Sequence, residues 1–127
     1  MKSTLRAVLA AVMIAGSGTA AIAHTKLVSS TPAANATVDK PGKIVLVFNE
    51  KLVPKFAGAE LTMTGMPGMA DHQPMKMTGF TTALSADGKT LTLLMKRALP
   101  SGNYELKWFA AGADAHRMEG SFPFAVK

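Results

Sequence analysis

The residues best suited to chemistry in this sequence are three histidines and nine methionines, in a chain without cysteine. Imidazole nitrogen and thioether sulfur are both metal donors, but thioethers select Cu(I), whereas imidazole also suits Cu(II) and other divalent ions. Without thiols, a metal site must use histidine, methionine, carboxylate or backbone groups. The spacing divides these donors into two groups, one that pairs the N-terminal region with His116 and one within residues 63–77.

His24 directly follows Ala21-Ile22-Ala23, which has the small residues that a signal peptidase requires. Two basic residues precede an unbroken apolar run over residues 7–14, and this run is too short for a membrane span, which takes about 20 apolar residues. The pattern predicts a cleaved secretory signal peptide over residues 1–23 and one exported domain over residues 24–127 that does not span a membrane.

Cleavage after Ala23 makes His24 the first residue of the mature chain. Its free amine and its ring nitrogen can then chelate one ion, and an imidazole from His116 completes a planar nitrogen set that suits Cu(II). Asp114 lies two residues before His116, on the same side of an extended chain. Its carboxylate is an oxygen ligand, the group that orients an imidazole, or an exposed surface carboxylate. Glu50, at the end of a predicted strand, is either a further ligand or an exposed surface carboxylate.

The second group is a methionine-rich segment in which donors recur every three residues. A helical core stripe is excluded because the intervening glycines and prolines break helices. A hydrophobic loop and an adaptable protein-binding surface remain alternatives. The three-residue spacing of the donors, and the glycines and prolines that let the loop curl, favour a soft Cu(I) site. In such a site several sulfurs converge and a histidine adds a nitrogen donor. The predicted donors of this site are Met63, Met66, Met69, His72 and Met75, whereas Met77, Met95 and Met118 are predicted to be packing residues.

Short segments rich in β-branched and apolar residues must position these donors. No part of residues 24–127 keeps helical periodicity over three turns, and turn residues separate the apolar segments, which is typical of an all-β sandwich. Trp108, the single tryptophan, is expected to anchor the core. The stronger predicted strands are Lys43–Phe48, Thr90–Met95, Asn103–Ala110 and Gly120–Val126, and the weaker ones are His24–Ser30, Ala57–Thr64 and Met77–Leu84.

The charge pattern argues against a nucleic-acid partner. The formal net charge is +6, but the lysines are scattered along the chain, with no basic run and no base-stacking aromatic motif. We therefore interpret the basic residues as a solvated surface.

Taken together, these segments resemble the CopC (PcoC) family of bacterial periplasmic copper-resistance proteins. The resemblance covers essentially all of residues 24–127, and its Met-Pro-Gly-Met element makes it specific. It rests on His24, residues 26–33 (KLVSSTPA), residues 48–53 (FNEKLV), residues 63–69 (MTGMPGM), residues 114–116 (DAH) and residues 120–127 (GSFPFAVK).

The resemblance implies a Greek-key β-barrel or immunoglobulin-like β-sandwich of about seven strands with separate Cu(II) and Cu(I) sites. It also implies a periplasmic copper carrier rather than an enzyme. Its expected partners are copper ions, an inner-membrane copper transporter of the CopD type and, as a second candidate, a multicopper oxidase. The implied Cu(II) ligands are His24 and His116, with Asp114 and Glu50 as oxygen candidates, and the implied Cu(I) ligands come from Met63, Met66, Met69, His72 and Met75.

Two other classes of function are alternatives. A histidine-brace copper enzyme, such as a polysaccharide monooxygenase, also uses an N-terminal histidine. This short chain has one tyrosine, so a flat aromatic face for carbohydrate is hard to build, and a carboxylate near copper would fill the position that oxygen needs. An interaction module would instead bind a partner through the methionine-rich segment without metal.

Overall fold

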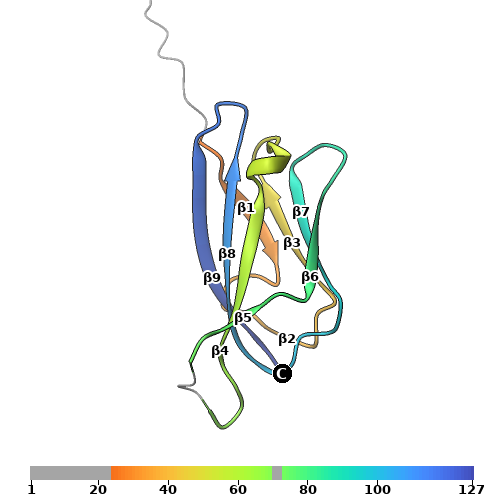
Figure 1. Cartoon of the computed structure of the whole chain (residues 1–127), viewed down its shortest axis with the longest axis vertical. Helices are drawn as coiled ribbons and strands as arrows, with labels where there is room; N and C mark the ends of the chain where they lie inside the picture. The colour runs from red at the N-terminus through yellow and green to blue at the C-terminus, as the bar shows by residue number, and fades with distance from the viewer. Residues whose placement is uncertain (1–23, 70–72) are drawn as a thin grey trace, which may run out of the picture.

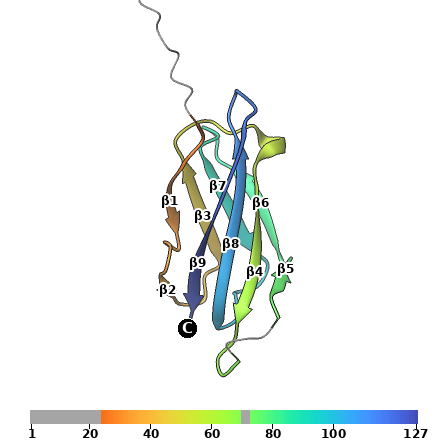
Figure 2. The ribbon, with the colours of Figure 1, turned by 90° about the vertical axis from the view of Figure 1, so that its left-hand side faces the viewer.

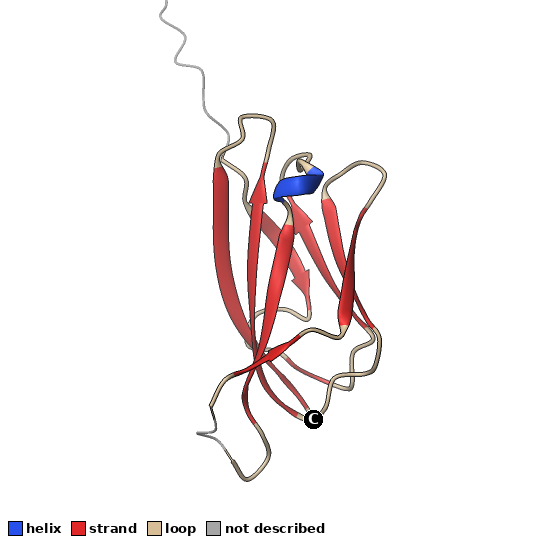
Figure 3. Cartoon of the chain, in the orientation of Figure 1, coloured by secondary structure: helices blue, strands red, loops and turns tan. Residues whose placement is uncertain are grey.

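The computed structural model describes residues 24–69 and 73–127 as two β-sheets packed face to face (Figures 1 and 3). Residues 1–23, which contain the predicted signal peptide, and residues 70–72, which contain His72, lie outside the described residues. In the described part the helical structure is limited to the three-residue 3-10 helix η1 (Pro54–Phe56), so no helix there is long enough to cross a membrane.

One sheet has four strands and the other has five. The four-stranded sheet has the order β1 (Leu27–Thr31), β3 (Lys43–Phe48), β7 (Thr90–Met95) and β6 (Phe80–Leu84). The five-stranded sheet has the order β2 (Thr37–Val38), β9 (Arg117–Val126), β8 (Gly102–Ala111), β4 (Gly58–Gly65) and β5 (Met75–Met77). Neighbouring strands are antiparallel except β2 and β9, which are parallel.

The predicted β-sandwich is confirmed, and its alternative, a closed barrel, is wrong because the two sheets stay separate. β3 and β7 have the predicted bounds, and β8 and β9 contain the segments predicted for them. The prediction of one strand over residues 77–84 is wrong. The chain turns at Thr78 and Gly79, so that β5 joins the five-stranded sheet and β6 joins the four-stranded sheet. About seven strands were predicted. Because of this division and the additional two-residue strand β2, the described residues form nine.

Alternating side chains of the facing strands form the core between the sheets. Along β8 every second residue from Gly102 to Ala110 is buried, as period-2 patterning requires. Trp108 is 8 % exposed and meets the Phe48 ring edge to face at 5.2 Å, which confirms its role as a core anchor. The buried Tyr104 hydroxyl donates a hydrogen bond to the Pro100 carbonyl at 2.6 Å, and burial raises the pKa of Tyr104 to about 12.

The long strands give the sandwich two distinct ends (Figures 1 and 2). The start of β1, the end of β3 and the β8–β9 hairpin lie at one end, and the β4–β5 hairpin lies at the other. β8 connects the two ends with ten residues, which at about 3.3 Å per residue places them roughly 30 Å apart. The described residues of the two predicted donor groups lie at these opposite ends.

Candidate functional site

At the first end, the side chain of Asn49 holds the segment that begins with His24. The Asn49 amide nitrogen donates to the His24 carbonyl oxygen at 3.1 Å, and the Lys26 backbone N–H donates to the Asn49 side-chain oxygen at 2.8 Å. The Asn49 backbone N–H also donates to the Lys26 carbonyl at 3.1 Å. These three bonds fix the backbone on both sides of Thr25 and leave the His24 side chain exposed.

Thr25 and Glu50 connect this segment to the β8–β9 hairpin. Thr25 is only 2 % exposed, and its hydroxyl donates a hydrogen bond to Glu50 Oε1. The Glu50 carboxylate also packs on Gly112, where an added Cβ would collide with both carboxylate oxygens. Glu50 is therefore half-buried and connects the N-terminal segment with the β8–β9 hairpin. It is not the exposed surface carboxylate that the sequence left open as an alternative.

The β8–β9 hairpin carries Asp114 and His116 on a tight turn. The Ala115 N–H donates to the Gly112 carbonyl at 3.0 Å, and Ala115 has a positive φ of 60°. The His116 backbone N–H donates to Asp114 Oδ1 at 3.1 Å, and His116 Nδ1 lies 3.3 Å from Asp114 Oδ2. The two side chains thus meet through a turn and not along the extended chain that the sequence predicted. Because Nδ1 faces the carboxylate, Nε2 is the ring nitrogen that remains for a ligand.

These contacts bring His24, Glu50, Asp114 and His116 to the same end of the sandwich, but not into one closed cluster. Within the part of the chain that the structure describes, no three histidine, aspartate or glutamate side chains are close enough to hold a metal ion together. The side chain of His116 is 65 % exposed, and His24 is exposed as well. Both imidazoles are therefore accessible, and exposed side chains can change rotamer without disturbing the core.

At the opposite end, the Met-Pro-Gly-Met element forms a tight turn that pairs two methionines. The Met66 and Met69 backbones exchange hydrogen bonds, with N···O distances of 3.1 Å and 2.9 Å. Pro67 and Gly68 occupy the centre of the turn, and Gly68 has a positive φ of 78°, which glycine adopts without strain. Directly paired residues project to the same side of a hairpin, so the two thioethers share one face. Met66 is 40 % exposed and Met69 is 58 % exposed.

A second methionine pair lies at the base of this hairpin. Met63 on β4 is the register partner of Met75 on β5. Their environments differ, since Met63 is 3 % exposed and belongs to the core, whereas Met75 is 53 % exposed. Among the predicted soft donors, Met66, Met69 and Met75 are therefore accessible, and Met63 is a packing residue as well as a potential donor. The predicted packing residues Met77, Met95 and Met118 do pack, partly buried, against the core.

Asn49 and Thr25, which hold the segment that begins with His24, were not identified from the sequence. An isolated polar residue at the end of a strand is common, and its role depends on which segment lies beside it. The pairing of β1 with β3 supplies that neighbour, since Leu27 lies opposite Phe48 and brings residues 24–26 next to Asn49. The one sequence feature that could have pointed to this role is the pair of polar residues, Asn49 and Glu50, directly after the apolar run of β3.

Comparison with known proteins identifies the family of this chain. A family model described as the CopC domain matches residues 27–127. The chain is 48 % identical over 118 residues to Copper resistance protein C of Xanthomonas campestris pv. juglandis, covering 91 % of each chain. It is 41 % identical over 122 residues to Copper resistance protein C of Escherichia coli, covering 96 % of each.

The fold agrees with these sequence relationships. The crystal structure of PcoC, a methionine-rich copper resistance protein from Escherichia coli, superposes with a TM-score of 0.74 at 42 % identity. The superposition covers 83 % of this chain and all of PcoC. With a family model that spans nearly all of the described residues, and relatives this similar over most of their length, the chain belongs to the CopC family.

Proposed function

We propose that this protein is a periplasmic copper carrier, with a Cu(II) site at the mature N-terminus and a separate Cu(I) site on the methionine-rich hairpin. The observation that carries the proposal is the tethering of His24 by Asn49 at the end of the sandwich that also bears His116. The names of its relatives support copper as the ion, since they are called copper resistance proteins.

In the proposed Cu(II) site, the ligands are the His24 amine, the His24 ring and Nε2 of His116. Two nitrogens from one residue and an imidazole from another form a planar set, which suits Cu(II). Asp114 accepts a hydrogen bond from the His116 backbone N–H, and its other oxygen lies 3.3 Å from ring Nδ1, a position from which it can orient the ring as outer carboxylates do for metal-binding histidines. Glu50 contributes by holding Thr25 and remains a further oxygen candidate.

The proposed Cu(I) site uses the exposed thioethers of Met66, Met69 and Met75. Thioether sulfur is neutral and polarisable, so it binds Cu(I) without losing a proton. Met63 is paired with Met75 across β4 and β5 but is buried, so it can join the site only if its side chain leaves the core. His72 remains a predicted nitrogen donor of this site, outside the described residues.

Exposed donors at two ends roughly 30 Å apart suit a carrier, because each ion can be exchanged with a partner without opening the core. We expect delivery to an inner-membrane copper transporter of the CopD type, after removal of residues 1–23 during export. Exchange with a multicopper oxidase is the second candidate route. The proposed ligands hold and release the ion, and no residue is assigned to catalysis.

The test of the Cu(II) site is a titration of two exported forms of the protein and one control form with Cu(II). One form begins at His24, as verified by mass, and the other carries four additional residues, Gly-Ser-Gly-Ser, before His24. We expect the first form to bind one equivalent of Cu(II) and the extended form to lose most of its affinity, because its amine is too far from the His24 ring to share a chelate with it. The same four residues added after Lys127 are the matched control and should change nothing. Equal Cu(II) affinity in all three forms would eliminate the amine-ligand assignment.

A further inference from the structure

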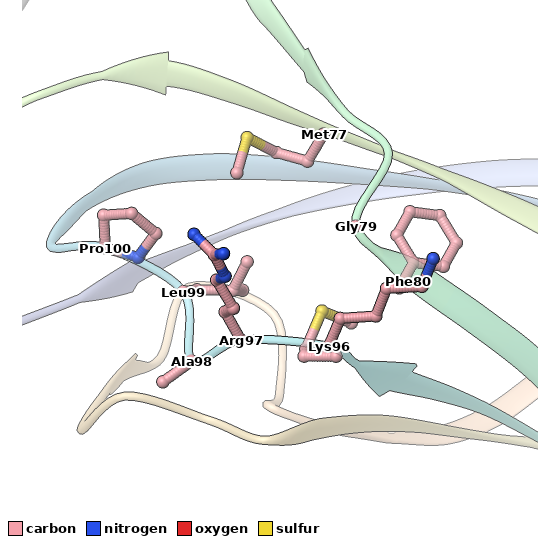
Figure 4. A pocket seen from close by; sticks show the side chains of 9 residues that line it. Met77, Gly79, Phe80, Lys96, Arg97, Ala98, Leu99 and Pro100 are labelled. Atoms are coloured by element: carbon pink, nitrogen blue, oxygen red, sulfur yellow. The ribbon is translucent and has the colours of Figure 1, made fainter.

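Beside the methionine-rich hairpin, a partly open cavity of about 320 Å³ lies where the two sheets separate (Figure 4). It lies between the turn that joins β5 to β6 and the loop that joins β7 to β8. Apolar side chains form most of its wall, principally Met77, Phe80, Met95 and Leu99. A volume of this order is at the small end of the range for binding sites and accommodates an apolar side chain of a partner.

Two cations line the same cavity. Lys96 and Arg97 are exposed, and in Figure 4 the Arg97 side chain points toward Met77. Among residues 24–69 and 73–127, the ion pairs lie elsewhere, and neither Lys96 nor Arg97 takes part in one. An apolar cavity edged by two cations without acidic partners is complementary to an apolar group flanked by negative charge.

The strands beside the cavity favour a polypeptide as the occupant. β5 is the last strand of one sheet and β6 is the last strand of the other, so each has one edge without a strand partner in the described chain. The free backbone N–H and C=O groups of such an edge can pair with an extended segment of another chain. A small amphiphilic molecule would use the cavity and the cations but not these edges.

We propose that this cavity is a docking site for an extended segment of a partner protein, in which acidic residues flank one apolar anchor side chain. Docking of this kind does not require copper. Met77 follows Met75 by two residues on β5, so a docked segment lies beside an exposed thioether of the hairpin. A contribution of docking to copper transfer rests on the proposed function, and docking is therefore measured on the metal-free protein.

The first experiment uses blocked tripeptides as probes and follows backbone amide chemical shifts of the metal-free exported protein. Ac-Glu-Phe-Glu-NH₂ should bind with a dissociation constant of about 1 mM and shift the amides of Gly79, Phe80 and residues 96–99. Ac-Lys-Phe-Lys-NH₂ and Ac-Glu-Gly-Glu-NH₂ should each bind at least tenfold more weakly. Equal binding of the lysine and glutamate peptides, or shifts located elsewhere, would overturn the proposal. Octanoate that binds more tightly than the acidic peptide would overturn it in favour of a small-molecule site.

Three variants connect the binding to the cavity. Arg97→Glu should weaken binding of the acidic peptide at least tenfold, because it places like charge at the cavity wall. Lys55→Glu, a matched charge reversal on η1 at the opposite end, should leave binding unchanged. Gly79→Leu should abolish binding by filling the cavity, and a Cβ at Gly79 meets no atom within 4 Å, so the fold is expected to tolerate it. Unchanged binding in both Arg97→Glu and Gly79→Leu, with native amide spectra, would refute the assignment of the site.

Discussion

Replacing Asn49 tests the proposed Cu(II) site without removing a proposed ligand. The Asn49 side chain makes two hydrogen bonds to the N-terminal segment, one to the His24 carbonyl at 3.1 Å and one from the Lys26 N–H at 2.8 Å. Asn49→Ala removes both and keeps the backbone hydrogen bond to Lys26. Each such bond contributes about 0.5–1.5 kcal/mol net, and because both are exposed we expect a total loss of about 1–2 kcal/mol.

This loss should appear as a weaker apparent affinity for Cu(II). When these hydrogen bonds are removed, a smaller fraction of the molecules has His24 positioned to chelate Cu(II) together with His116. The apparent dissociation constant for Cu(II) rises by the factor by which that fraction falls. At 1.4 kcal/mol per factor of ten, the expected decrease in affinity is about 5- to 30-fold. The assay is competition against a chelator of known affinity. Asn103→Ala, which removes an exposed amide from the opposite end of β8, is the control and should have no effect.

Two results would refute this reasoning in different ways. If Asn49→Ala binds Cu(II) as tightly as the parent, while the protein extended by Gly-Ser-Gly-Ser before His24 has lost its affinity, then the amine is a ligand but the tether does not position it. If electron paramagnetic resonance shows a different number of nitrogen ligands in Asn49→Ala, then Asn49 acts on the metal directly. The Cu(I) affinity should be the same in both proteins, because Asn49 lies at the other end of the sandwich.

Three further predictions follow from individual contacts. Asp114→Ala should lower the Cu(II) affinity about 10- to 100-fold without changing the number of nitrogen ligands, measured by competition titration and electron paramagnetic resonance, because the His116 ring loses its orienting carboxylate. Gly112→Ala should destabilise the fold by about 1–3 kcal/mol in denaturant unfolding, and Glu50→Ala in the same chain should recover part of that loss, since the added Cβ collides with the Glu50 carboxylate. Met66→Leu should weaken Cu(I) binding and change stability by less than about 0.5 kcal/mol, whereas Met63→Ala should cost about 2–5 kcal/mol because Met63 is a core residue.

Most of the fold could be predicted because the long strands carry their pattern in the chain itself. In β8 and β9, apolar and polar residues alternate closely enough that the buried face can be identified from the sequence. β3 and β7 are short runs of apolar and β-branched residues. The division of residues 77–84 between two sheets was missed for a physical reason. Apolar residues on both sides of a two-residue turn look like one strand when the partner strands are unknown, and the change of sheet is a tertiary property.

The candidate site was less predictable, because its geometry depends on contacts between distant segments. His24 and His116 were identified by chemistry and position, yet nothing local to either residue shows that Thr25 bonds to Glu50 or that Glu50 packs on Gly112. The methionine period was visible in the sequence, but the burial of Met63 was not, because it depends on the core that β4 forms with β8. Sequence spacing thus indicated the candidate donors, and tertiary packing determined which of them are accessible.

The separation of the two ends predicts that the two proposed copper sites act independently. At roughly 30 Å, charges are several Debye lengths apart, since this length is about 8 Å at physiological ionic strength. β4 and β8 connect the ends through a packed core, and the proposed ligands are exposed side chains that can move without shifting these strands. Loading the methionine-rich hairpin with Cu(I) should therefore change the Cu(II) affinity less than twofold, measured anaerobically, with Met66→Leu as the control. Because coupling is reciprocal, a tenfold change in either direction would mean that the sites share a ligand or that copper bridges two molecules, and only bridging would depend on protein concentration.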